Sequence, residues 1–322
     1  MNDERAIGRS GLSTPPLVLG GNVFGWTADR DTSFAVLDAF VAGGGRMIDT
    51  ADVYSSWVPG HVGGESETVI GAWMKARGNR DKVLVATKVG YTGAPGGLTP
   101  EGIAAAIEAS LQRLQTDHVD VYYAHIDDSQ TPLEETMAAF GALIAAGKVR
   151  AFGASNYDAA RLAALDAARA AVGAPEIAVF QPHYNLMHRA EFEGPVQQYC
   201  LANEIGVMPY FALASGFLTG KYRTAADIKG ARGEWIAGYL DAFGLGVLAA
   251  LDRVAAEAGA TPGQVALAWL AHQPGITAPI ASATSVAQAE QLIGAMHMTL
   301  NAEQIAVLDK SSTRAESCQN DG

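Results

Sequence analysis

Residues 83–90 of this chain read Val-Leu-Val-Ala-Thr-Lys-Val-Gly, which is the clearest strand in the sequence. Four apolar residues in a row at its start are typical of a parallel strand that is covered on both faces. A lysine, Lys88, stands near the end of the run. On either side of this stretch, short apolar runs alternate with longer stretches of helical period, which is the pattern of repeated βαβ units.

The alternation predicts eight strands and eight helices. We expect the strands at residues 17–20, 47–49, 83–88, 119–124, 149–154, 177–181, 206–210 and 276–280. We expect the helices near residues 32–42, 66–74, 100–114, 133–146, 158–171, 195–203, 245–258 and 286–296. Thr99 and Thr131 each stand before a proline and an acidic first turn, so we expect each to cap a helix. Turn residues between Ile7 and Leu12 predict an N-terminal hairpin.

Polar side chains recur at one phase of the repeated unit, at or just beyond the ends of successive strands. They are Asp49, Lys88, His125, Ser155, Gln181 and Tyr210. In a closed barrel all strand ends surround one site, whereas an open doubly wound sheet would spread these residues along a line. We therefore favour an α/β fold with one domain over residues 1–322, a (β/α)8 TIM barrel with an N-terminal β-hairpin plugging the barrel bottom.

Composition excludes several classes of function. The chain has 322 residues, of which 49% are hydrophobic and 17% charged, and its 34 acidic and 22 basic residues give a net charge of −12. Nucleic-acid-binding proteins need a basic surface instead, and no apolar run here is long enough for a membrane span. The N-terminus lacks a secretory signal, and Cys200 and Cys318 are too few for a disulfide framework. We expect a cytoplasmic protein without nucleic-acid or membrane partners, whose oligomeric state leaves no mark in the sequence.

Three of these polar residues, Asp49, Lys88 and His125, fit one kind of chemistry together with Tyr54. Asp49 and Lys88 lie at the ends of neighbouring predicted strands, and each alone is more often part of a structural ion pair than catalytic. Beside Tyr54, however, an ammonium fixed by a carboxylate is expected to lower the pKa of the phenol and make it a proton donor near neutral pH. His125 is placed to hydrogen-bond a substrate oxygen. Together these residues predict a site that polarises and protonates a carbonyl group.

Other reactions fit the pattern less well. A Schiff-base aldolase would use Lys88 as its nucleophile, but it has no need of the neighbouring phenol. A metal-dependent hydrolase would need clustered ligands, and the seven histidines show neither His-x-His nor His-Glu-x-x-His spacing, so we expect no metal site. A Gly-x-Gly-x-x-Ala match at residues 244–249 follows no predicted strand, which argues against a dinucleotide-binding fingerprint.

Several segments resemble the aldo-keto reductase family, in the family's order and from about Ile7 to Asp309. The matching segments are Asp49-Thr50-Ala51-Asp52-Val53-Tyr54, the following Gly63 to Glu67, the lysine strand at 83–90, Asp120 to His125 with Thr131-Pro132, and Gly147 to Asn156. The resemblance implies a barrel that binds an extended nicotinamide cofactor and transfers hydride to or from a carbonyl carbon. It also implies that Tyr54 is the general acid, that Lys88 and Asp49 tune it, and that His125 orients the carbonyl.

The resemblance further implies a cofactor-binding set along the strand ends. In the family Ser155, Asn156 and Gln181 would hold the carboxamide, Tyr210 would stack on the nicotinamide, and the loop from Leu213 to Tyr222 would cover the pyrophosphate. The full expected set is Gly21, Asn22, Val23, Asp49, Ser155, Asn156, Gln181, Tyr210, Phe211, Leu213, Ser215, Gly216, Lys221, Ser282, Ser285, Gln288 and Gln291.

The sequence departs from the family after the eighth strand. There the family usually supplies a cation to the 2′-phosphate of NADP and an Asn to the adenine, whereas residues 281–292 contain neither. Hydroxyls and amides bind a phosphate less strongly than a guanidinium does, so we expect NADP as the family default with NAD also usable.

The expected substrate is a small-molecule carbonyl compound or alcohol. Trp26 and Trp57, together with Tyr54 and His125, are expected to line its pocket, which would suit a bulky hydrophobic carbonyl or a stacked sugar. Residues 223–243 are expected to form a mobile lid. Channel-associated members of the family suggest an alternative, a regulatory subunit that senses redox state by binding the cofactor and acts on a membrane partner.

Overall fold

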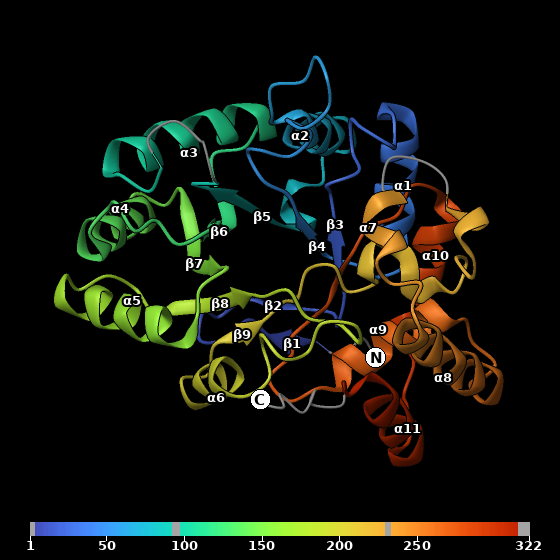
Figure 1. Cartoon of the computed structure of the whole chain (residues 1–322). Helices are drawn as coiled ribbons and strands as arrows, with labels where there is room; N and C mark the ends of the chain where they lie inside the picture. The colour runs from blue at the N-terminus through green and yellow to red at the C-terminus, as the bar shows by residue number, and fades with distance from the viewer. Residues whose placement is uncertain (1–3, 92–96, 229–232, 315–322) are drawn as a thin grey trace.

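The eight expected strands form one parallel sheet in the computed structural model, which describes residues 4–91, 97–228 and 233–314. Neighbours along the sheet follow the order β10-β3-β4-β5-β6-β7-β8-β9 (Figure 1). The strands are β3 (Val18–Gly20), β4 (Met47–Asp49), β5 (Leu84–Val89), β6 (Val119–Ala124), β7 (Val149–Ser155), β8 (Ile177–Gln181), β9 (Gly206–Val207) and β10 (Ile280–Ala281).

The two end strands of this sheet meet and close it into a barrel. A parallel bridge joins Val207 to Ile276, and the amide of Thr277 donates to the carbonyl of Val207 at 2.8 Å. The last two strands are shorter than expected because Pro209 and Pro279 have no N–H to donate to a ladder. The prediction of a (β/α)8 barrel is confirmed.

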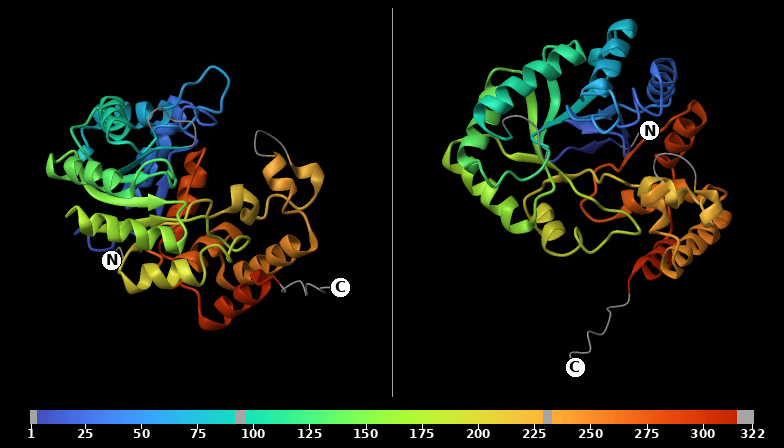
Figure 2. Two further views of the ribbon diagram at one scale, coloured as in Figure 1. Left: turned by 60° about the vertical axis from the view of Figure 1, so that its left-hand side comes forward. Right: turned by 45° about the horizontal axis from the view of Figure 1, so that its top comes forward.

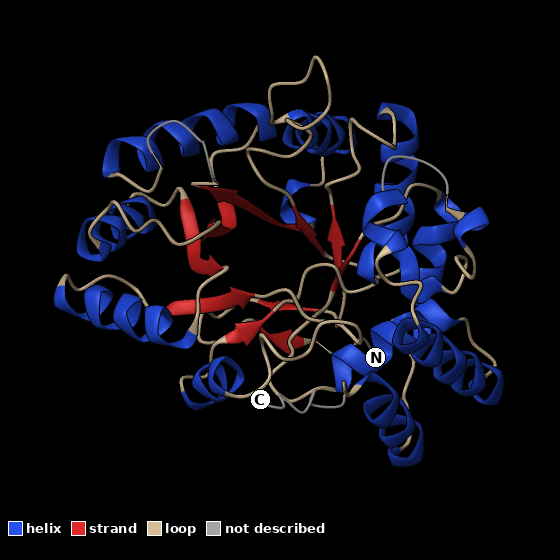
Figure 3. Cartoon of the chain, viewed as in Figure 1, coloured by secondary structure: helices blue, strands red, loops and turns tan. Residues whose placement is uncertain are grey.

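Helices surround the strands on the outside, as Figures 2 and 3 show from three directions. Those that follow the expected pattern are α1 (Arg30–Ala42), α2 (Glu65–Arg77), α3 (Pro100–Leu114), α4 (Leu133–Ala145), α5 (Ala159–Ala171), α6 (Pro195–Ala202), α8 (Ala242–Ala258) and α10 (Val286–Ala295). The additional ones are α7 (Gly233–Ala237), α9 (Pro262–His272) and α11 (Ala302–Ser312), with 3-10 turns η1 (Arg80–Lys82), η2 (Ala214–Thr219) and η3 (Ala225–Asp227). No helix of the described residues is long and apolar enough to cross a membrane.

The two helix caps expected from Thr-Pro pairs have different outcomes. Thr99 caps α3, since its side chain accepts a hydrogen bond from the amide of Gly102. Thr131 does not cap α4: that helix begins at Leu133, with Pro132 in the cap position and no side-chain cap. The Thr131 hydroxyl instead donates to the Asp128 carboxylate at 2.8 Å, so that expectation is wrong.

The expected hairpin closes the N-terminal end of the barrel. Strands β1 (Arg5–Ala6) and β2 (Ser13–Thr14) pair antiparallel, and the turn between them buries Ile7 and Leu12 in the cluster of side chains inside the barrel. Gly8 in this turn has a φ of +51°, and a Cβ there would lie 2.1 Å from the carbonyl oxygen of Ala178. Only glycine allows this close approach, and the prediction of a plug at the barrel bottom is confirmed.

Candidate active site

Asp49 and Lys88 meet at the C-terminal rim because they end two neighbouring strands, β4 and β5. The Lys88 ammonium is fully buried and donates to Asp49 Oδ2 at 2.6 Å. It also donates to the carbonyl of Thr50 at 2.7 Å and to the hydroxyl of Tyr54 at 3.0 Å. Three oxygens therefore surround one cation, which fixes the position of each.

Tyr54 lies in the turn that follows β4, so its phenol points back at the rim. Its hydroxyl donates to Asp49 Oδ2 at 3.4 Å while it accepts from Lys88. Burial, and then the Asp49 carboxylate, raise the pKa of Tyr54 well above its usual value of 10.0. The expected lowering of the pKa of this phenol is therefore wrong for the chain in this structure, because the loss of water around the phenolate outweighs the nearby cation.

Burial shifts the pKa values of Lys88 and Tyr54 in opposite directions. Burial lowers the pKa of Lys88, although the Asp49 carboxylate opposes that shift. Tyr54 keeps its proton at any pH near neutrality, as a general acid must before it reacts. The ammonium at 3.0 Å is then ready to stabilise the negative charge that would remain on the phenol oxygen after proton transfer.

His125 follows β6 and is held by a hydrogen bond from its amide to the carbonyl of Val89 at 2.8 Å. Its ring centroid lies 6.3 Å from that of Tyr54. Burial and the Lys88 ammonium hold the pKa of His125 well below 6.5, so the imidazole is neutral at physiological pH. Its Nδ1 is buried and has no hydrogen-bond partner within the described residues.

The next strands add amide and hydroxyl groups to the same rim. Gln181, the last residue of β8, donates from Nε2 to Asp49 Oδ1 at 2.9 Å, and Ser155, the last residue of β7, donates to the carbonyl of Gln181 at 2.8 Å. Asn156 donates to the carbonyl of His125 at 2.8 Å from a backbone with a φ of +61°. Asparagine is among the few residues that adopt this left-handed conformation at modest cost.

Tyr210 lies beyond β9, where its amide donates to the carbonyl of Pro182 at 2.9 Å. Its hydroxyl donates to Asn156 Oδ1 at 2.8 Å, which joins it to the network around Asp49. The neighbouring Phe211 is 40% exposed and meets the Tyr210 ring edge to face. The structure thus brings together all six residues that the strand-end pattern singled out.

The expected pyrophosphate loop is compact. Leu213 precedes η2, inside which Ser215 and Gly216 have φ values of +57° and +94°. Lys221 follows this turn, with its ammonium 5.0 Å from the ring centroid of Tyr222. The amides of Gly216 and Leu218 both donate to the carbonyl of Leu213, at 2.9 and 3.2 Å, which closes the turn.

The residues expected to meet the rest of the cofactor are partly engaged with one another. Ser282, just after β10, donates to Asn22 Oδ1 at 2.5 Å, which connects the ends of β10 and β3. Ser285 caps α10 by accepting from the amide of Gln288, whose own side chain accepts from the amide of Thr284 at 2.8 Å. The side chains of Ser285 and Gln288 therefore already shape the N-terminus of α10.

Three further members of the expected cofactor set differ in what they expose. Gly21 is buried, and a Cβ there would lie 2.9 Å from the hydroxyl of Ser66. A larger residue at this position would therefore push the backbone or Ser66 out of place. The side chain of Val23 is fully buried in the outer core and offers only its backbone. Gln291 lies within α10, where its carbonyl accepts from the side chain of Gln264.

Aromatic rings extend outward from the phenol. Trp57 lies 6.1 Å from Tyr54 between ring centroids, and Trp26 lies 5.5 Å from Trp57. Tyr91, which the sequence analysis did not single out, lies 4.8 Å from the His125 ring and is 42% exposed. Its position directly after the lysine strand was the signal that could have found it.

Of the expected lid, residues 229–232 lie outside the described residues, and the rest contains η3 and α7.

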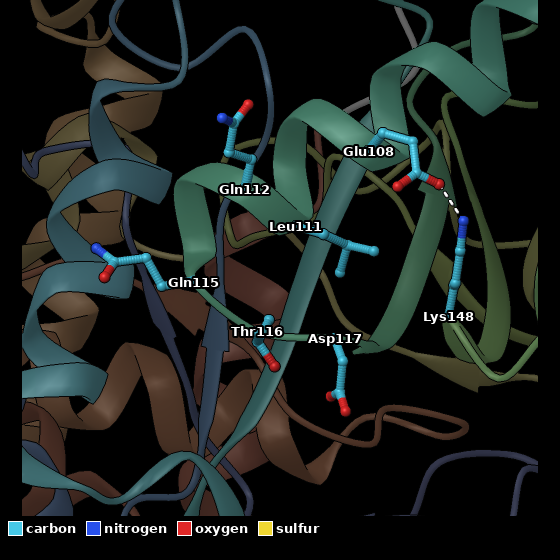
Figure 4. A pocket seen from close by; sticks show the side chains of 7 residues that line it. All are labelled: Glu108, Leu111, Gln112, Gln115, Thr116, Asp117 and Lys148. Atoms are coloured by element: carbon cyan, nitrogen blue, oxygen red, sulfur yellow. Dashed lines mark hydrogen bonds and ion pairs between the residues drawn. The ribbon is translucent and has the colours of Figure 1, made fainter.

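A hollow in the surface lies away from these residues. It has a volume of about 850 Å³ and is lined by residues 108, 111, 112, 115–117 and 148, with Glu108 and Lys148 paired across one side (Figure 4). Asp117 lies two residues before β6 and Lys148 directly before β7, so this hollow opens at the end of the strands opposite to Asp49. Within the described ranges, no three His, Cys, Asp or Glu side chains gather as a metal site.

Comparison with known proteins agrees with this geometry. Residues 16–313 match the model of the aldo/keto reductase family. An uncharacterised oxidoreductase of Bacillus subtilis, YrpG, is 33% identical over 94% of this chain and 94% of its own length. A norsolorinic acid reductase of Aspergillus flavus is 30% identical over 93% of this chain and 78% of its own. The aldo-keto reductase str7 of Strobilurus tenacellus is 32% identical over 91% of this chain and 84% of its own length.

The family model spans nearly the whole barrel, and the relatives are similar over nearly the whole chain. These matches cover each strand end from which the buried Asp49–Lys88 pair and its neighbours project. The chain belongs to the aldo/keto reductase family.

Proposed function

We propose that this chain is an NAD(P)H-dependent carbonyl reductase that uses Tyr54 as its general acid. The observation that carries the proposal is the contact of the Lys88 ammonium with both Tyr54 and Asp49, at 3.0 and 2.6 Å, in a fully buried position. A protonated phenol beside a fixed cation is suited to giving a proton to a carbonyl oxygen.

Each residue of the site has a part in the proposed reaction. The neutral His125 ring hydrogen-bonds the carbonyl oxygen and turns it toward the Tyr54 hydroxyl. The phenol gives up its proton to that oxygen, and Lys88 stabilises the phenolate that remains. Asp49 holds Lys88 in place and is itself oriented by the side chain of Gln181. The nicotinamide coenzyme, when bound, supplies the hydride.

The residues along the rim fit such a coenzyme. Ser155, Asn156 and Gln181 place hydroxyl and amide groups beside one another for a carboxamide, and Tyr210 presents a partly exposed flat ring next to them. At the other end, a Cβ on Gly20 would lie 2.6 Å from the Ser282 hydroxyl, so glycine allows the ends of β3 and β10 to approach closely. The side chains that bond one another at the N-terminus of α10 in the described residues are hydroxyls and amides. We therefore propose that NAD is accepted beside NADP, the usual coenzyme of the family.

The rings around the phenol favour a flat, bulky carbonyl compound over a sugar. Trp57 is 48% exposed and forms an edge contact with Trp26, so the two present apolar faces rather than hydrogen-bond partners. The name of the Aspergillus flavus relative, a reductase of norsolorinic acid, supports a bulky substrate as well. We propose aromatic ketones and aldehydes, or the matching alcohols in the reverse direction, as the substrate class.

Two features argue against a Schiff-base aldolase. The Lys88 ammonium has no exposed surface, and its three oxygen partners occupy its donors. A substrate carbonyl would have to displace Tyr54 to reach the nitrogen. Borohydride would therefore trap no carbonyl compound on Lys88.

The first test is a panel of aromatic and aliphatic carbonyl compounds and sugars, assayed with NADH and NADPH by nicotinamide absorbance. We expect turnover of aromatic carbonyl compounds, and a roughly 10³-fold lower kcat in Tyr54→Phe with coenzyme affinity within a few-fold. Tyr199→Phe, which changes a phenol on α6, is the matched control and should keep full activity. Undiminished turnover in Tyr54→Phe would contradict the proposal, and tight coenzyme binding without any turnover would favour a regulatory subunit.

A further inference from the structure

Four rings form a continuous column that begins at Tyr210 and runs away from the rim. The His183 ring stacks on Tyr210 with centroids 5.3 Å apart and planes within 17°. His188 packs on His183 at 4.2 Å, and its Nε2 lies 2.9 Å from the hydroxyl of Tyr239. The reaction proposed above uses none of His183, His188 and Tyr239.

Backbone contacts fix this column in place. A parallel bridge joins His183 to Tyr210. Asn185 and His188 exchange two backbone hydrogen bonds at 3.1 and 3.0 Å, and the buried Asn185 side chain donates to the carbonyl of Phe211 at 2.9 Å. One short turn therefore sets the positions of both imidazoles relative to residues 210–211.

The two imidazoles carry no charge near neutral pH. Burial, and then His188, lower the pKa of His183 to about 4. Burial also lowers the pKa of His188, with Glu191 opposing and Arg314 supporting the shift. His183 Nε2 is buried and has no partner within the described residues. An unpartnered polar atom costs stability, so the core gains nothing from a histidine over an apolar ring at this position.

We propose that His183 and His188 are positioning residues that hold the ring of Tyr210 from behind, so that its other face is aligned to stack on the nicotinamide of the coenzyme. The inference rests on the proposed function. His183 covers one face of Tyr210, Phe211 meets its edge, and the bond to Asn156 fixes its hydroxyl. A ring held in this way loses little freedom when a second planar ring stacks on it, and pre-organisation of this kind raises affinity.

The absence of charge in the column matters for the oxidised coenzyme. Its nicotinamide ring carries a positive charge, which a cation behind Tyr210 would repel. Neutral imidazoles avoid that repulsion and still provide flat rings for stacking. The column should therefore support oxidised and reduced coenzyme alike.

The test compares three substitutions by coenzyme affinity, kcat and melting temperature. His183→Ala removes the ring behind Tyr210, and we expect the Kd of both coenzyme forms, followed by fluorescence quenching, to rise about tenfold. The kcat at saturating coenzyme should stay within about twofold, because the proton-transfer groups are untouched. His183→Phe restores a flat ring and should bring the Kd back to within about twofold of wild type. Tyr239→Phe loses only one hydrogen bond and should have an effect of about two- to threefold.

His118→Ala is the matched control, since His118 lies at the opposite end of the barrel and pairs with Asp117. Wild-type affinity in a folded His183→Ala chain overturns the inference and leaves the proposed function standing, even if the melting temperature falls. Equal weakening in His183→Ala and His183→Phe overturns it as well. A wild-type chain that binds neither NADPH nor NADH overturns the proposed function and the inference together.

Discussion

The two ends of the barrel each hold a buried aspartate that is paired with basic side chains. At the C-terminal end, Asp49 binds the ammonium of Lys88 at 2.6 Å. Near the N-terminal end, Asp120 of β6 binds the guanidinium groups of Arg80 at 2.9 Å and Arg150 at 2.7 Å. Both carboxylates are almost completely inaccessible to water, so burial alone does not distinguish them.

Their partners do distinguish them. Arg80 and Arg150 keep 21% and 49% of their side chains exposed, and a guanidinium does not release its proton in a protein. Lys88 has no exposed surface, its pKa is lowered by burial, and it contacts a phenol. The pair at the bottom can only hold strands together, whereas the pair at the rim can respond to a proton leaving Tyr54. This division agrees with the general placement of stability and chemistry at opposite ends of such barrels.

The largest effect is expected from removing the cation at the rim. In Lys88→Met nothing stabilises the phenolate that proton transfer would leave, so we expect kcat to fall by roughly 10²–10⁴ and any residual activity to show a shifted pH optimum. Steady-state rates between about pH 5 and 9 test this. An unchanged pH profile would show that Lys88 does not act on Tyr54.

A smaller effect of a different kind is expected at the bottom. Asp120→Ala removes the acceptor shared by Arg80, Arg150 and the amide of Val85. We expect the free energy of unfolding to fall by about 3 kcal/mol in a urea titration. The kcat of the folded fraction should stay within about twofold of wild type. A large loss of kcat in fully folded protein would contradict the division between the two ends.

The rim was predictable from the sequence because its residues follow the period of the fold. Asp49, Ser155 and Gln181 each end a strand and Lys88 is the last residue but one of β5, and an apolar run followed by a polar residue is visible without coordinates. Helix α9 was missed for the opposite reason. Residues 265–270 are buried all round, so the helix shows no polar face, although Thr261 and Gln264 form a capping box at its start.

Electrostatic detail was less predictable, because it depends on how completely packing excludes water. The sequence places a cation near Tyr54, which suggests a lowered pKa, but the structure buries the phenol and the pKa rises. The column behind Tyr210 also depends on tertiary contacts. His183 and His188 lie in an irregular segment between β8 and α6, so no periodic pattern in the sequence indicates that they face each other.

Another aspartate, Asp52, is half-buried close to the rim and resembles neither of the other two. Its Oδ1 is buried and has no hydrogen-bond partner within the described residues. Burial, and then the nearby Glu67, raise the pKa of Asp52 from 3.8 to about 7, although Arg113 and Lys88 oppose the shift. Asp52 thus lacks the bonded cation that both Asp49 and Asp120 possess.

The smallest effect is therefore expected from Asp52→Asn, and it should depend on pH. Because folding raises the pKa of Asp52, the native state is favoured while the carboxyl is protonated and loses that advantage as the pH rises from 3.8 to about 7. An amide cannot ionise, so Asp52→Asn should be more stable than wild type at about pH 8, with little difference at about pH 4. We expect about 2 kcal/mol, roughly half of what the full pKa shift would give, because water reaches part of this half-buried side chain. Urea titrations at the two pH values measure this. An equal change at both would mean that Asp52 acts by its shape or hydrogen bonding. A loss of stability confined to high pH would mean that Arg113 and Lys88 stabilise its charge, as the bonded cations do for Asp49 and Asp120.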